Sequence, residues 1–150
     1  MIMPKYPTCF VCGEENERGL KLTFTETENG IEAPFNLPDN LCSYKGVIHG
    51  GIVSTILDEG LGWAGYPPTQ KHYLTAELKV RYKRPVMSNT EYITRSRLVD
   101  LKKKIFLAAG EIVDRDGNIL VTAEAKYFIV KEPQLDRETG TITKASMREK

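Results

Sequence analysis

The stretch HGGIVSTILDEG, His49–Gly60, decides the fold of this chain. It joins an imidazole and two glycines to an apolar run that ends in two neighbouring carboxylates, Asp58 and Glu59. From the glycines onward, apolar residues recur at spacings of three and four, which is the period of one buried helix face. The pattern predicts a helix from either glycine to about Ala64, ended by a glycine and two prolines. The apolar stripe consists of Ile52, Val53, Ile56, Leu57, Gly60, Leu61 and Ala64.

The segments on both sides of this helix alternate apolar and polar residues, which is typical of β-strands. Glu28–Gly30 and Asp116–Asn118 have the composition of hairpin turns, and Pro38–Ile48 that of a loop. One helix combined with an antiparallel meander predicts the α+β class, with the helix available to be wrapped by the sheet. The expected strands are Gly19–Glu26, Ile31–Pro38, Leu74–Tyr82, Glu91–Val99, Ile105–Asp114 and Ile119–Val130.

Length, composition and charge limit the function. The 150 residues, 41% of them hydrophobic, are enough for one domain with its own core. A net charge of +1 disfavours nucleic acid and anionic membrane surfaces as partners. The chain starts without the apolar core of a signal peptide, and no run of about 18 apolar residues occurs. We therefore expect a cytoplasmic protein with small partners.

Three cysteines, Cys9, Cys12 and Cys42, are expected to stay reduced. The CxxC pair has the spacing of half a zinc site, which Cys42 and either His49 or His72 would complete. A local turn with ordinary thiols explains the pair equally, and a single CxxC favours that interpretation. We therefore expect no metal.

The helix face opposite the apolar stripe has an unusual composition. It consists mostly of small polar residues with Asp58 near its centre, and no Lys or Arg occurs between Lys45 and Lys71. A carboxylate on a helix usually lies on a face exposed to solvent. The small side chains around Asp58 would also allow another protein surface to approach. We therefore expect a second copy to cover this face. The face comprises Ser54, Thr55, Asp58, Glu59 and Gly62.

The two glycines stand where the first turn of a helix exposes unpaired N–H groups and partial positive charge. The amides of Gly50 and Gly51 are suited to donate to a carbonyl oxygen under attack, while Asp58, two turns along, orients or deprotonates water. Alternatively, the glycines only permit a tight junction between loop and helix. The first interpretation predicts an oxyanion site with an acid beside it.

HGG followed by a carboxylate nine residues after the histidine, on a helix before a β meander, resembles hotdog-fold acyl-CoA thioesterases of the phenylacetate-pathway type. The likeness covers roughly residues 19–130, and the N-terminal CFVCG resembles a branch of that superfamily with a CxxCG leader. It implies an antiparallel sheet wrapped around one long central helix, a homodimer or homotetramer, and sites at subunit boundaries. We expect a hotdog domain over residues 1–131, including a leader over residues 1–18, and a charged tail over residues 132–150.

The resemblance implies an acyl-CoA substrate, no further cofactor, and roles for named residues. Asp58 is the catalytic carboxylate, acting as general base or nucleophile, and the Gly50 amide, with Gly51 beside it, polarises the thioester carbonyl. His49 shapes the helix entrance, and the Thr75 hydroxyl approaches from the partner subunit. Ser43 replaces an Asn that several relatives use to hold water or substrate. Glu59 is the alternative acid, since some relatives use Glu there, or a structural partner.

Further residues are candidates for substrate binding. Trp63 either lines an acyl pocket or packs in the core. Four basic residues either contact CoA phosphates or act as solubilising charges at strand ends. The same fold also carries dehydration or hydration of 3-hydroxyacyl thioesters, and non-catalytic acyl-CoA binding is a third alternative. The basic residues are Arg81, Arg84, Lys102 and Lys104.

Overall fold

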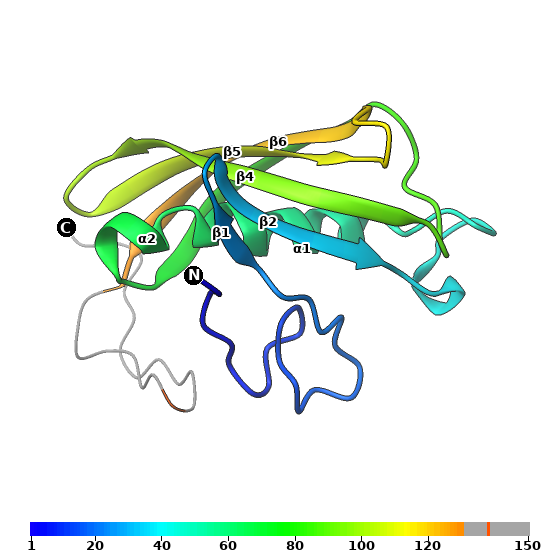
Figure 1. Cartoon of the computed structure of the whole chain (residues 1–150), viewed down its shortest axis with the longest axis horizontal. Helices are drawn as coiled ribbons and strands as arrows, with labels where there is room; N and C mark the ends of the chain where they lie inside the picture. The colour runs from blue at the N-terminus through cyan, green and yellow to red at the C-terminus, as the bar shows by residue number, and fades with distance from the viewer. Residues whose placement is uncertain (131–137, 139–150) are drawn as a thin grey trace.

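Helix α1, Gly50–Trp63, lies across one face of a six-stranded antiparallel sheet (Figure 1). This computed structural model describes residues 1–130 and 138, so the expected tail lies outside the described residues except for residue 138. The apolar stripe of α1 is buried as predicted, because Val53, Ile56 and Leu57 are each at most 2% exposed. Burying one such side chain contributes about 1.5–3 kcal/mol. The helix is therefore held against the sheet by its periodic apolar residues.

The sheet has the strand order β1-β2-β4-β5-β6-β3, and every neighbouring pair is antiparallel. The α+β class and the hotdog arrangement, a sheet curved around one long helix, are as predicted. Strand β3, the first strand after α1 in the chain, forms one edge of the sheet. The strands are β1 Thr25–Thr27, β2 Gly30–Asn36, β3 Tyr73–Tyr82, β4 Glu91–Leu101, β5 Ile105–Val113 and β6 Ile119–Ile129.

The leader, residues 1–18, changes the structure of the segment that follows it. The prediction of a strand over Gly19–Glu26 is wrong for most of its length, because only its end belongs to β1. The N–H of Leu20 donates to the carbonyl of Phe10, and that of Leu22 to the carbonyl of Val11, both at 2.8 Å. Lys21 has φ of 56°, which interrupts an extended chain. The leader therefore takes the hydrogen bonds that a longer first strand would have made, and the hairpin of β1 and β2 is short.

Two short helices lie beside α1. Helix α2, Tyr66–Thr69, contains the two prolines that the sequence predicts only as a stop signal. Proline is tolerated in a first helical turn because the N–H it lacks has no intrahelical acceptor there. A 3-10 turn, η1, Asp39–Leu41, lies within the predicted loop before α1. Within the described residues, every helix is too short or too polar to span a bilayer.

Candidate active site

Asp58 projects from α1 toward strands β3 and β6. Its Oδ1 accepts a hydrogen bond of 2.8 Å from the Thr75 hydroxyl and one of 3.2 Å from the Tyr127 hydroxyl. Oδ2 has no hydrogen-bond partner among the residues that the structure describes, and it is not sealed from solvent. Burial raises the pKa of Asp58, while the hydrogen bonds from Thr75 and Tyr127 lower it. The carboxylate is thus oriented through one oxygen and open at the other.

The partner of Asp58 on β3 belongs to the same chain. Thr75 makes this contact within one chain, and its approach to a site of a partner subunit stays a prediction. A β-bulge between Thr75 and Glu77 shifts the register with β6 directly after this residue. Tyr127 was missed from the sequence; alternation along β6 places it on the inner face, but nothing in the local pattern marks its hydroxyl as a partner of Asp58.

Glu59 leaves the helix in a different direction. Its Oε1 accepts a hydrogen bond of 3.1 Å from Trp63 Nε1 and lies 3.7 Å from the Cys9 thiol. Burial, and then the proximity of Cys9, raise the pKa of Glu59 to about 7. Trp63 itself is 2% exposed and packs edge-on against Tyr66 and Tyr73. Trp63 therefore packs in the core of the single chain, as one of the two interpretations predicts, and its contribution to an acyl pocket stays a prediction.

The start of α1 distinguishes between its two glycine amides. His49 is the N-cap residue, and its Nδ1 accepts a hydrogen bond of 2.9 Å from the N–H of Gly51. The N–H of Gly50 has no acceptor within the described part of the chain. Tyr82, which the sequence did not single out, donates to the Gly50 carbonyl at 2.6 Å and contacts Ser54 Oγ. Gly50 is therefore the available donor, and Gly51 is occupied.

The loop before α1 brings Ser43 toward this helix start. The neighbouring residue Cys42 pairs with Ile48 across an isolated bridge, and the N–H of His49 donates to the Leu41 carbonyl at 2.9 Å. The Ser43 side chain is exposed, and within the described residues the side-chain hydrogen bonds to the Asp58 carboxylate come from Thr75 and Tyr127. Ser43 thus lies at the entrance of the helix and away from the carboxylate.

The expected oxyanion site with an acid beside it does not form within one chain. Eight residues separate Gly50 from Asp58, which corresponds to about 12 Å along a helix at 1.5 Å per residue. The unpaired N–H groups of the first turn also point along the axis away from Asp58. A general base that acts through one water lies within roughly 6 Å of the carbonyl oxygen it serves. The Gly50 amide and the Asp58 carboxylate of one chain therefore lie too far apart to act on one carbonyl group.

The polar face of α1 is largely covered by its own chain. An added Cβ on Gly62 would lie 2.0 Å from the Tyr73 ring, so this glycine permits close packing of β3. Thr75 and Tyr127 cover Asp58, and the leader covers Glu59. The small residues therefore admit a strand of the same subunit, and a covering partner is not needed to explain them.

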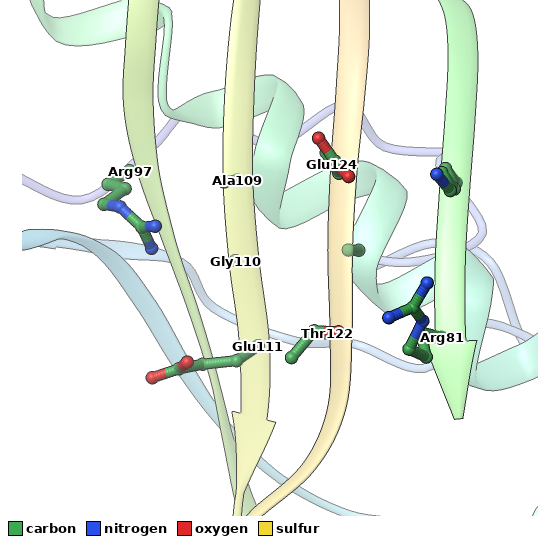
Figure 2. Close-up of a pocket in the computed structure, with 9 residues that line it drawn as sticks. Arg81, Arg97, Ala109, Gly110, Glu111, Thr122 and Glu124 are labelled. Carbon is green, nitrogen blue, oxygen red and sulfur yellow. The ribbon is translucent and has the colours of Figure 1, made fainter. Parts of the chain in front are cut away.

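The basic residues lie on different parts of the sheet. Figure 2 shows Arg81 and Arg97 on opposite sides of a shallow hollow, with β5 and β6 between them, on the face of the sheet away from α1. Arg81 is therefore separated from Asp58 by the sheet. The N–H of Arg84 donates to the carbonyl of Leu120, whereas the carbonyl of Lys104 accepts from Ile129. These two positions lie at opposite ends of β6, about 30 Å apart at 3.3 Å per residue. Lys102, two residues before Lys104, forms an ion pair with Asp100 at 3.9 Å.

These clusters therefore do not converge on one ligand phosphate within one chain. Their role as phosphate contacts stays a prediction that depends on how chains assemble. The geometry that the single chain does provide is the carboxylate of Asp58 on one side of the sheet and the free amide of Gly50 at the helix start.

A family model for the thioesterase superfamily matches residues 45–121, which include α1 and the strands β3 to β5. The chain belongs to the thioesterase superfamily. An uncharacterised mitochondrial protein of Candida albicans is 32% identical over 117 residues, which are 73% of this chain and 52% of that protein. An acyl-coenzyme A thioesterase of Rattus norvegicus is 24% identical over 110 residues, 73% of this chain and 47% of that enzyme. The chain thus spans about half the length of these curated relatives.

Solved structures share the fold. The crystal structure of a thioesterase superfamily protein aligns with a TM-score of 0.72 at 24% identity, over 79% of this chain and 62% of that one. A Streptococcus mutans protein bound to acetyl-CoA aligns with a TM-score of 0.66 at 15% identity, over 73% of this chain and 88% of that one. At these identities the likeness shows the hotdog fold.

Proposed function

We propose that this protein hydrolyses acyl-CoA thioesters to a free acid and a thiol, as thioesterases of the phenylacetate-pathway type do. The observation that carries the proposal is the Asp58 carboxylate, which is held through Oδ1 and open at Oδ2 within the described residues. Membership of the thioesterase superfamily supports a thioester substrate. The fold shared with a protein bound to acetyl-CoA supports coenzyme A as the carrier, so no separate cofactor is required.

In the proposed reaction, Asp58 Oδ2 accepts a proton from water while the water oxygen bonds to the thioester carbon. The carbonyl oxygen becomes negative and accepts a hydrogen bond from a Gly50 N–H. The C–S bond then breaks, and the sulfur leaves with the proton that Asp58 returns. Alternatively, Asp58 attacks the carbon directly, the C–S bond breaks to release the thiolate, and water then hydrolyses the anhydride to the free acid and the Asp58 carboxylate. Both routes use the same two groups, and the residues alone leave the choice open.

The proposal requires two chains at each site, because Gly50 and Asp58 of one chain are too far apart to act on one carbonyl. A two-fold axis would place Asp58 of each chain opposite Gly50 of the other and create two equal sites. The ten-residue strand β3 supports such an assembly, since it ends the sheet and has one side unpaired among the described strands. An edge of this length is a template for pairing with a second copy. We therefore propose a homodimer, from which a homotetramer would form by pairing of dimers.

The experiment is a thiol-release assay on short-chain, medium-chain and aromatic acyl-CoAs. We expect release from at least one class and a loss of about 10²-fold or more with Asp58→Asn, which keeps the size of the side chain but removes its basicity. Glu59→Gln is the matched control on the next residue, and we expect it to retain most of the rate. Absence of thiol release from the whole panel excludes the proposal, and turnover of crotonyl-CoA without thiol release indicates hydration instead.

A further inference from the structure

The leader and α1 bring together three groups that the proposed reaction does not use. The thiols of Cys9 and Cys12 and the carboxylate of Glu59 offer ligand atoms that all lie within 4.8 Å of one another. Cys12 is buried, and Cys9 and Glu59 are partly buried. We propose that these three side chains bind a thiophilic divalent cation, with Zn²⁺ as the cation that best fits this set of donors. The site lies on the side of Glu59 and is independent of the proposed hydrolysis.

The spacing of the ligand atoms fits tetrahedral coordination. Zinc binds thiolate sulfur at about 2.3 Å and carboxylate oxygen at about 2.0–2.2 Å. At the tetrahedral angle, these bond lengths separate sulfur from oxygen by about 3.6 Å. Cys9 Sγ lies 3.7 Å from Glu59 Oε1 and 3.9 Å from Oε2. Cys9 and Glu59 can therefore bind one ion with side-chain movements of a few tenths of an ångström, and Cys12 Sγ lies within 4.8 Å of both.

The backbone around the thiols is already folded into a tight turn. The N–H of Gly13 donates to the Cys9 carbonyl at 2.9 Å, and a Cβ at Gly13 would lie 2.5 Å from the Pro7 carbonyl oxygen. The turn places the sulfur atoms of Cys9 and Cys12 within 4.8 Å of each other and of the Glu59 carboxylate. This turn therefore holds both sulfurs on the side that faces Glu59 without any ion present.

The charges of the cluster also favour a cation. Glu59 has no Lys or Arg within ion-pair distance among the described residues, and its carboxylate accepts hydrogen bonds from Trp63 and Cys9. A carboxylate removed from water without a cationic partner is costly unless it binds a proton or a metal ion. Two deprotonated thiols and one carboxylate carry three negative charges, of which a divalent cation neutralises two. Binding would release the thiol protons to solvent and leave a fourth coordination position for water.

The structure replaces the ligands that the sequence suggested for a zinc site. Cys42 pairs with Ile48 in the loop before α1, and the His49 ring caps the helix start. His72 contacts the Tyr6 hydroxyl at 2.8 Å through Nδ1. None of the three is part of the cluster of possible ligands found among the described residues. Glu59, next to the proposed catalytic residue in the chain, takes their place.

The test uses the whole protein with a metal-free phosphine reductant, stripped with a chelator and titrated with Zn²⁺ and, separately, Co²⁺. Trp63 is the only tryptophan and donates to Glu59, so its fluorescence reports occupation of the site. We expect saturation at about one ion per chain, a thiolate-to-cobalt charge-transfer absorption band, and a rise of the thermal unfolding midpoint. Cys9→Ser and Cys12→Ser should weaken the affinity for Zn²⁺ at least ~100-fold. Loss of a residue that only hydrogen-bonds to a metal ligand already costs about 10–100-fold in metal affinity.

Two matched controls make the result specific. Cys42→Ser removes a thiol outside the cluster and should leave the zinc affinity unchanged. Asp58→Asn and Glu59→Gln each remove one carboxylate from adjacent residues, and only the second should weaken zinc binding.

If a ligand variant does not fold, alkylation of the wild type replaces it, because zinc should slow the modification of Cys9 and Cys12 but not of Cys42. The inference is overturned if wild-type protein shows no saturable binding, or if zinc protects all three thiols equally.

Discussion

Mixed dimers test whether each site is shared between two chains. The test combines two variants, Asp58→Asn, which removes the proposed base, and Gly50→Pro, which removes the proposed oxyanion donor. Proline suits the first position of a helix, where its missing N–H breaks no intrahelical bond. His49, with φ of −54° and ψ of 131°, already has the conformation preferred before proline. A Cβ at Gly50 meets its nearest neighbour, Tyr82, at 3.6 Å, an ordinary contact.

The expected magnitudes follow from the distance between the two groups. Each variant alone should lose about 10²–10³-fold in kcat, which corresponds to about 2.7–4 kcal/mol of transition-state stabilisation. In a heterodimer of the two variants, one site combines both changes, while the other combines the intact Asp58 with the intact Gly50. Random exchange makes about half of the dimers mixed, so about a quarter of the sites regain wild-type composition. Activity should then rise about 25-fold or more above either parent.

The assay is thiol release after the two variants are co-expressed with different affinity tags, with the content of heterodimers measured by native mass spectrometry. Gly50→Ala is the control that keeps the N–H, and it should lose less activity than Gly50→Pro. Activity that stays at the level of the parents, in a preparation shown to contain heterodimers, would refute the shared site. It would mean that Asp58 acts with a donor other than the amide of Gly50.

Local periodicity explains why most of the fold could be predicted. The helix was expected to reach about Ala64 and ends at Trp63, because spacings of three and four fix both its type and its buried face. The strands after the helix were predicted in the same way, from apolar residues that recur with a period of two. The hairpin of β1 and β2 forms as predicted, but its first strand is shorter than expected. Alternation shows that a segment is extended but does not name its partner. There the leader competes for the backbone of Leu20 and Leu22.

The candidate site was less predictable, because its contacts join residues that lie far apart in the sequence. Tyr127 is 69 residues from Asp58, and Cys9 is 50 residues from Glu59. The helical wheel correctly separates the directions of Asp58 and Glu59 by about 100°. It cannot show which element covers each direction. That is why the small polar face suggested a partner subunit, although β3 and the leader of the same chain cover most of it.

Two further substitutions test the packing around α1. Thr75→Val removes the hydroxyl that donates to Asp58 and lowers its pKa, so the pKa should rise. Because the proposed base acts as the carboxylate, the acidic limb of the kcat/KM profile for thiol release should move to higher pH, and an unchanged limb contradicts the role of Thr75. Gly62→Ala would place a Cβ 2.0 Å from the Tyr73 ring, whereas at Gly50 the nearest atom is 3.6 Å away. Overpacking of this kind costs about 1–3 kcal/mol, which exceeds the roughly 0.5–1 kcal/mol that alanine gains over glycine within a helix. Urea denaturation should therefore find Gly62→Ala less stable than both wild type and Gly50→Ala. Equal stability of the two alanine variants would show that the Tyr73 ring does not pack against α1 in solution, and the cover over the polar face of the helix would have to come from elsewhere.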